Sequence, residues 1–143
     1  MNIQYSQQDP KTIDSQAVVY FQSKTDNLQD ISSSLEKAAA LSSFAFKTGE
    51  ILTSPSFDDA TAPRFYVVGL TKQSTDDFRQ AAGAAGLQAR KDGVQTITLV
   101  VSSDDAQIHQ AILTGWWRRA CHAGISRLTP GSGSAKRRYI MQS

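Results

Sequence analysis

Arg64-Phe65-Tyr66-Val67-Val68-Gly69-Leu70 is the stretch of this sequence that decides the fold. It is a run of apolar, β-branched and aromatic residues, which is typical of a strand buried on both faces of a sheet. A polar turn, Thr71-Lys72-Gln73, follows, and Ser74 or Thr75 can then cap a helix. That helix is predicted from Asp76 to about Lys91, with an alanine-rich side that can pack closely against a sheet.

The rest of the chain alternates in the same way between apolar runs and helical periodicity. The other predicted elements are a strand at Ala17–Phe21, a helix from Leu28 to about Phe44 capped by Asp26 or Asn27, a short strand at Glu50–Thr53, a strand at Thr96–Val101, and a third helix capped by Ser102 or Ser103 with Asp104 and Asp105 in its first turn. Such alternation implies right-handed crossovers and a mostly parallel sheet with helices on both faces. The sequence therefore predicts an α/β fold.

Length and composition describe one globular domain. The chain has 143 residues, of which 40% are hydrophobic, and no stretch approaches the roughly 18 apolar residues of a membrane-spanning helix. The N-terminus, Met1-Asn2-Ile3-Gln4-Tyr5, lacks the basic and apolar regions of a signal peptide. Cys121 is the only cysteine, so a disulfide framework is excluded. We expect a cytoplasmic protein without a membrane partner.

Charge divides the chain into two parts. Residues 1–115 carry nine basic and all 13 acidic residues, a net charge of −4, whereas residues 116–143 carry six basic residues and no acid. The helical periodicity stops at Trp116, and Leu128–Ser134 has the composition of a flexible linker. We therefore predict a domain over 1–115 and a basic tail over 116–143 that is non-native or disordered.

No motif in the domain specifies a site. Gly69-Leu70-Thr71-Lys72 lies where a strand meets a helix, the usual ligand position in an open α/β sheet, but it lacks the glycines of a nucleotide-binding loop. We interpret it as a structural turn, with anion binding at the helix N-terminus as the alternative. The pairs Asp58-Asp59, Asp76-Asp77 and Asp104-Asp105 are interpreted as solvated or helix-capping carboxylates rather than metal ligands.

The histidines, the cysteine and the tail offer no stronger candidates. His109 falls inside a predicted helix, and Cys121-His122 supplies too few ligands for a closed zinc site. Trp116-Trp117-Arg118-Arg119, together with Lys136-Arg137-Arg138, fits nucleic-acid binding only weakly, and exposed tryptophans are equally typical of a non-native sequence. We predict no catalytic, cofactor-binding or metal-binding residue in this chain.

The segment from Arg64 to Val101 resembles the N-terminal domain of the cytosol (leucine) aminopeptidase family. The resemblance rests on Phe65-Tyr66-Val67-Val68-Gly69-Leu70 followed by Lys72, on the alanine-rich helix, and on Gly93-Val94-Gln95-Thr96-Ile97-Thr98-Leu99-Val100. It extends more loosely from Ala17 to Gly115. Thr71 stands where the family usually has a second glycine.

The resemblance implies a macro-like, three-layer α/β/α domain that precedes a larger catalytic domain. In that family the catalytic domain holds two divalent metals, zinc or manganese, on a Lys/Asp/Glu cluster and removes N-terminal residues from peptides. Members form hexamers, and some bacterial ones bind DNA. The family's Asn-Thr-Asp-Ala-Glu-Gly-Arg-like catalytic motif is absent from this sequence. We therefore carry over no functional residue, and we expect the chain alone to be inactive, to hold no cofactor, and to partner a peptidase catalytic domain or other copies of itself.

The tail departs from the family, which continues with a Tyr-Arg-Phe-Asp-like stretch where this chain has Gly124-Ile125-Ser126-Arg127-Leu128. One permissible codon choice for Cys121 to Pro130, read two bases later, restores a Tyr…Phe-Asp pattern. Our leading hypothesis is therefore a truncated N-terminal domain of an aminopeptidase, with a frameshift as one origin of the truncation and a natural or artificial truncation as the others. The alternatives are a stand-alone macro-like ligand-binding domain and a nucleic-acid-binding accessory domain.

Overall fold

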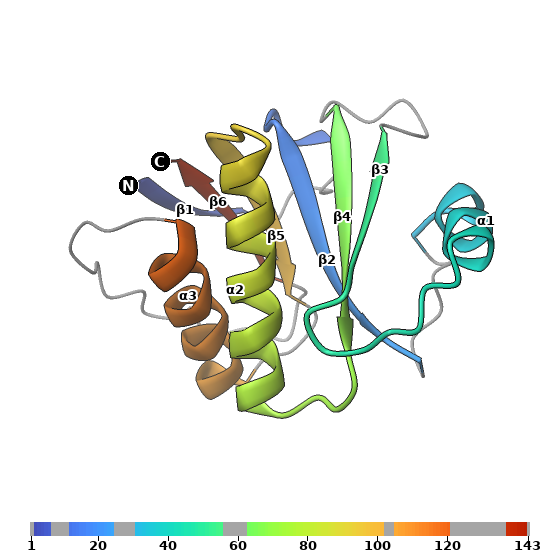
Figure 1. Cartoon of the computed structure of the whole chain (residues 1–143). Helices are drawn as coiled ribbons and strands as arrows, with labels where there is room; N and C mark the ends of the chain where they lie inside the picture. The colour runs from blue at the N-terminus through green and yellow to red at the C-terminus, as the bar shows by residue number, and fades with distance from the viewer. Residues whose placement is uncertain are drawn as a thin grey trace.

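The computed structural model describes residues 2–6, 12–24, 31–55, 63–101, 105–120 and 137–142. Its elements in chain order are β1 (Asn2–Ser6), β2 (Ala17–Ser23), α1 (Ser33–Leu41), β3 (Ile51–Pro55), β4 (Arg64–Leu70), α2 (Thr75–Lys91), β5 (Thr96–Val101), α3 (Ala106–Ala120) and β6 (Arg137–Gln142). The strands form one sheet in the order β1-β6-β5-β2-β4-β3 (Figure 1).

Three adjacent strands at the centre of the sheet are parallel. β2 pairs with β4 on one side, from Val18↔Phe65 to Ser23↔Leu70, and with β5 on the other. β3 adds an antiparallel edge to β4. The prediction of an α/β fold with a mostly parallel sheet is therefore confirmed for the four strands β5, β2, β4 and β3. β6 and β1 extend the sheet beyond β5 with antiparallel pairing that we did not predict.

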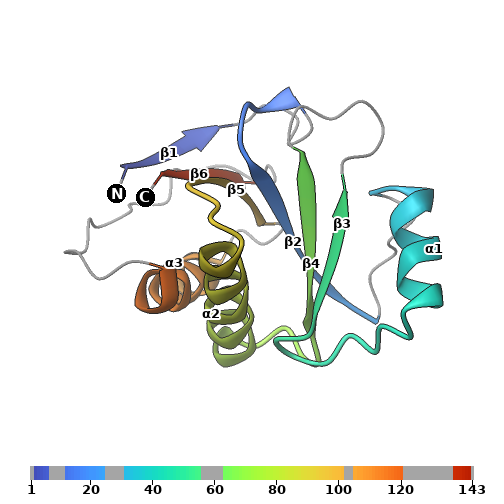
Figure 2. The ribbon, with the colours of Figure 1, turned by 45° about the horizontal axis from the view of Figure 1, so that its top comes forward.

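The sheet is the middle layer of three. α2 and α3 lie side by side on one face, and α1 lies on the other face near β3 (Figures 1 and 2). Alternate side chains of the central strands point to opposite faces, so that Tyr66 and Val68 belong to the core under α2 and α3. Val67 instead packs with Leu35 of α1 and Leu52 of β3. This arrangement confirms the predicted α/β/α layering.

Small residues bring α2 and α3 close to the sheet and to each other. The buried face of α2 includes four alanines and two glycines, Ala81, Ala82, Gly83, Ala85, Gly86 and Ala89. On α3, a Cβ atom added to Gly115 would overlap the backbone carbonyl of Arg79 in α2. The helices approach closely because neither carries bulk at this contact.

α1 is shorter than the predicted helix from Leu28 to Phe44. It begins after Ser32, whose side chain accepts a hydrogen bond from the Ser34 amide at 3.1 Å, as N-cap serines do. The expected caps Asp26 and Asn27 lie outside the described residues. The helix ends in a Schellman motif, in which the Phe44 amide donates to the Ala39 carbonyl and Ser43 takes the left-handed conformation, with φ of 56°.

The last helix differs from the prediction at both ends. Asp105 precedes α3 and caps it by accepting from the Gln107 amide at 2.9 Å, whereas we expected it inside the first turn. At the other end the helix runs to Ala120, so the predicted domain boundary at 115/116 falls within it. Trp116, expected to be exposed, is only 4% exposed and packs in the main core.

The predicted tail also contributes a strand to the sheet. Arg137–Gln142 forms β6, which pairs with β5 from Thr96↔Gln142 to Val101↔Arg137. This part of residues 116–143 thus differs from the predicted disordered tail. Local composition did not indicate this strand, because strand pairing at a sheet edge depends on the partner strand.

Candidate functional site

The carboxyl ends of β2 and β4 mark a break between the two helical layers. These neighbouring parallel strands end in register at Ser23 and Leu70. The chain after β2 leads to α1 on one face of the sheet, and the turn after β4 leads directly to α2 on the opposite face (Figure 2). In open α/β sheets, connections that diverge in this way leave a crevice where ligands bind.

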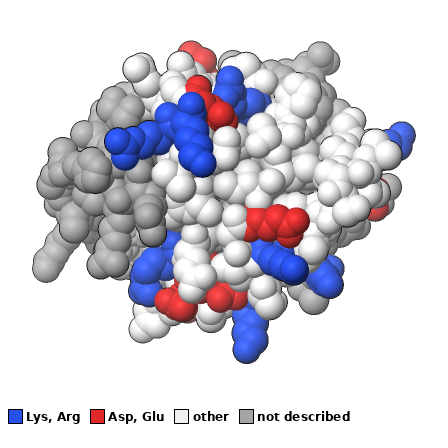
Figure 3. Space-filling view, in the orientation of Figure 1, with Lys and Arg blue, Asp and Glu red and all other residues white. Residues whose placement is uncertain are grey.

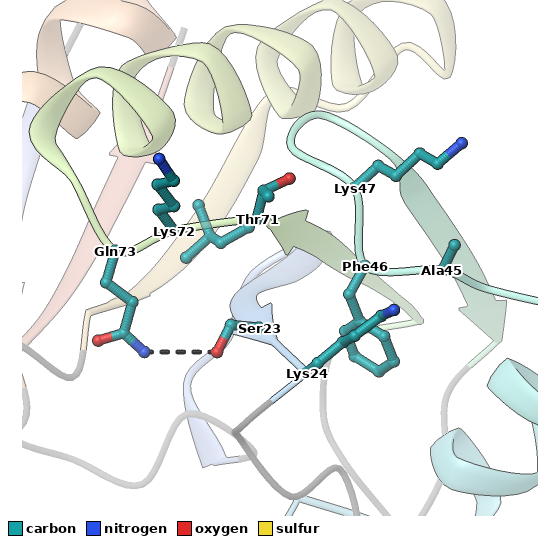
Figure 4. Close-up of a pocket in the computed structure, with 9 residues that line it drawn as sticks. Ser23, Lys24, Ala45, Phe46, Lys47, Thr71, Lys72 and Gln73 are labelled. Carbon is teal, nitrogen blue, oxygen red and sulfur yellow. Dashed lines mark hydrogen bonds between the residues drawn. The ribbon is translucent and has the colours of Figure 1, made fainter.

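A pocket lies at this point. Its volume is about 370 Å³, and it is lined by residues from three segments: the end of β2 with Ser23 and Lys24, the loop Ala45-Phe46-Lys47 that leads into β3, and the end of β4 through its turn, Leu70 to Gln73 (Figure 4). The Gln73 side-chain amide faces the Ser23 hydroxyl at 3.5 Å. Three lysines, the two hydroxyl groups of Ser23 and Thr71, and the Gln73 amide therefore line the pocket together with Phe46 and the buried Leu70.

Gly69 allows the loop wall to approach β4. A Cβ atom at this position would lie 2.7 Å from the carbonyl carbon and 2.9 Å from the Cα of Phe46, closer than real side chains pack. Two backbone hydrogen bonds hold this approach, one from the Gly69 amide to the Glu50 carbonyl at 2.8 Å and one from the Gly49 amide to the Gly69 carbonyl at 3.2 Å. The glycine of the strand-end segment thus has a packing role at the pocket wall.

The carboxylate of Glu50 fixes the shape of the same loop. It accepts hydrogen bonds from the backbone amides of Ala45 at 3.1 Å and of Lys47 at 3.2 Å. Between these two amides, Phe46 has a φ of 58°, a left-handed conformation that is unusual for a residue other than glycine. Backbone amides that converge in this way form a small anion-binding concavity, and here an internal carboxylate fills it.

Two further contacts tie the pocket segments together. Thr48 and Thr71 hydrogen-bond reciprocally, each backbone amide donating to the other hydroxyl, at 3.2 and 3.0 Å. The Asp77 carboxylate accepts from the Lys72 backbone amide at 2.7 Å, while its own amide donates to the N-cap Ser74. The first turn of α2 is therefore already supplied with an acceptor and a negative charge by the chain itself.

These contacts refine the interpretation of Gly69-Leu70-Thr71-Lys72. The segment is a structural turn in the sense that Gly69, Thr71 and the Lys72 amide hold neighbouring segments. Three of its four residues, Leu70, Thr71 and Lys72, also line the pocket. No sequence motif singled out Lys24 or Lys47; the one available signal was that Lys24 follows a predicted strand that ends at the same edge of the sheet.

The other residues considered from sequence lie away from this pocket or outside the described residues. Asp76 belongs to the first turn of α2, as predicted, and pairs with Arg79 at 3.1 Å. His109 is buried in α3. Outside the described residues are Asp58, Asp59, Asp104, Cys121 and His122.

A second polar cluster stands at the opposite end of β4. The Tyr66 hydroxyl donates to the Asp92 carboxylate, which also lies 3.4 Å from the Arg64 guanidinium and accepts from the Gln88 side chain at 3.2 Å. Burial, together with the bond to Asp92, raises the pKa of Tyr66 to about 12. The hydrogen bond from Tyr66, followed by those of Gln88 and Arg64, lowers the pKa of Asp92. This cluster joins the end of α2 to the first residues of β4.

On the face shown in Figure 3, the described residues form no uniform basic patch. Lysine and arginine side chains lie among aspartates and glutamates on the face seen in Figure 3. In the described part of the chain, no group of three or more His, Cys, Asp or Glu residues is placed to hold a metal ion. Within the same residues, no helix has the length and apolarity needed to cross a bilayer.

Comparison with known proteins identifies the family. Residues 15–118 match the N-terminal domain of the cytosol aminopeptidase family. The chain belongs to this family. The match covers all elements from β2 to β5 and continues into α3 as far as residue 118, which places Trp116 inside the family domain. No curated protein matches the sequence of this cytosol aminopeptidase N-terminal domain.

Among solved structures, the domain is similar to the bottromycin maturation enzyme BotP. The TM-score is 0.56 at 19% sequence identity, a level that establishes a shared fold. The similarity covers 71% of this chain but only 22% of BotP. This chain therefore corresponds to a minor part of that longer enzyme.

Proposed function

We propose that this chain is a non-catalytic domain that assists the assembly or regulation of a metallopeptidase. The observation that carries the proposal is the family match, which spans residues 15–118 and is specific to the N-terminal domain of cytosol aminopeptidases. The match with BotP supports it, because a domain of this fold there occupies about a fifth of a longer enzyme chain.

In this proposal the chemistry belongs to a separate catalytic domain. That domain would hold two divalent metals, zinc or manganese, and remove N-terminal residues from peptides, as the family resemblance implies. This chain would contribute a folded surface to the complex in the cytoplasm, either against the catalytic domain or between copies of itself.

The proposal is tested by mixing the chain with the separately expressed catalytic domain of a cytosol aminopeptidase from the same organism. Light scattering coupled to size-exclusion chromatography should show a complex heavier than either component. The rate of leucine p-nitroanilide hydrolysis should change when the chain is added. If the elution, the mass and the rate are all unaffected at micromolar concentrations, the assembly and regulatory role is wrong.

A further inference from the structure

We propose that the pocket between the carboxyl ends of β2 and β4 binds a small organic phosphate. The proposal does not depend on the assembly role, because it concerns a site formed entirely by this chain. It is carried by three observations: the position of the pocket, the lysines around it, and the apolar groups inside it.

The position of the pocket gives it a wall from each of three segments. Lys24 follows β2, Lys47 belongs to the loop before β3, and Lys72 follows β4. The reciprocal bonds between Thr48 and Thr71 fix the second and third segments to each other. These hydrogen bonds leave the pocket with a defined backbone frame even though its lysine side chains are exposed.

The pocket carries an excess of one positive charge, because three lysines stand against the two nearby carboxylates of Glu50 and Asp77. No ion pair joins Lys24, Lys47 or Lys72 to an acid within the described residues. The two nearby carboxylates, Glu50 and Asp77, are directed to backbone amides. Figure 4 shows the three lysine side chains extending in different directions around the pocket. Their flexible four-carbon stems allow them to turn onto a bound anion.

The charge and the lining together indicate the class of ligand. A phosphate monoester carries about −1.5 to −2 charges near neutral pH, which matches several lysines better than a single carboxylate does. The Thr71 hydroxyl and the Gln73 amide can donate further hydrogen bonds to phosphoryl oxygens. Leu70, Ala45 and Phe46 then offer apolar contact to the organic part of the ligand. A volume of about 370 Å³ is at the small end of ligand pockets, which run from about 300 to 1,000 Å³, so the ligand is small.

Calorimetry on the full chain with four probes tests the ligand class. Phenyl phosphate should bind about tenfold more tightly than inorganic phosphate, because the ring adds apolar contact with Phe46 and Leu70. Its affinity should fall as NaCl is raised, since the lysines are exposed to solvent. Benzoate and phenol should bind more weakly than phenyl phosphate. Equal or tighter binding of benzoate or phenol would overturn the proposal, as would no binding of phenyl phosphate at millimolar concentration.

Lysine variants test the location. Each of Lys24→Gln, Lys47→Gln and Lys72→Gln should weaken phenyl phosphate binding about three- to fivefold, and the triple variant about 30-fold or more. Lys91→Gln is the matched control, because this exposed lysine lies at the other end of α2. All four positions are exposed, so the melting temperature should not change. If the triple variant binds like the control, the phosphate site is not in this pocket.

Discussion

Replacing Gly69 with alanine should destabilise the domain more than any ordinary glycine substitution would. The new Cβ would lie 2.7 and 2.9 Å from two backbone atoms of Phe46, so the loop would have to move by roughly 1 Å to reach normal packing distance. This shift would break or stretch the two backbone hydrogen bonds between Gly69 and the loop. Two such bonds contribute about 2 kcal/mol, and the steric strain adds about 1–2 kcal/mol, for a total of about 3–4 kcal/mol.

Gly93→Ala is the matched control for this prediction. Gly93 has a φ of 70°, and a Cβ atom there would meet nothing within 4 Å. Gly93→Ala should therefore lower the free energy of unfolding only by the cost of holding alanine in the left-handed conformation, about 1–2 kcal/mol. Urea denaturation followed by far-ultraviolet circular dichroism measures both free energies of unfolding. If Gly69→Ala costs no more than Gly93→Ala, the close approach of the loop to β4 is not as described.

Three further changes test the loop and the second polar cluster. Glu50→Ala removes the acceptor of the Ala45 and Lys47 amides and should lower the free energy of unfolding by about 2 kcal/mol. Glu36→Ala is the control, because Glu36 is exposed, and should lower it by at most about 0.5 kcal/mol. Equal losses would contradict the role of Glu50. Ser43→Gly relieves a left-handed conformation at the end of α1 and should raise the stability by about 0.5–1 kcal/mol in thermal melts, and a loss would show that the serine side chain matters more than its backbone. The pKa of Tyr66 is raised to about 12 in the folded protein from 10 in the unfolded chain. The contribution of Tyr66 to the free energy of unfolding should therefore be constant below pH 10 and fall by about 2–3 kcal/mol as the pH rises to 12. Tyr66→Phe should remove this part of the alkaline loss, and an unchanged pH profile in that variant would refute the shift.

The central strands and α2 were predictable because their signals are local. Arg64–Leu70 and Thr96–Val101 are apolar runs that match β4 and β5 at both ends, and the serine at position 74 caps α2 as expected. The edges of the sheet were not predictable in this way. β1 and β6 form an antiparallel pair between residues more than 130 positions apart, and such pairing depends on tertiary context rather than on composition.

The candidate site was only partly predictable for the same reason. The segment Gly69-Leu70-Thr71-Lys72 stood out because it connects a strand to a helix. The pocket wall formed by Ala45-Phe46-Lys47 did not stand out in the sequence, because its shape depends on the Glu50 carboxylate and on the left-handed backbone conformation of Phe46. Neither feature has a sequence signature. The charge step at Trp116 was a true feature of composition, but it did not mark the end of the helix that contains Trp116.

An aminopeptidase assay on the chain alone tests the central claim most directly. The purified chain, with zinc or manganese added, would be incubated with leucine p-nitroanilide, and the release of p-nitroaniline would be compared with buffer containing the same metal. We expect no release of p-nitroaniline above the buffer rate with either metal. Metal-dependent turnover that co-elutes with the chain on size-exclusion chromatography would contradict it, because this domain would then carry the chemistry that we assign to a separate catalytic domain.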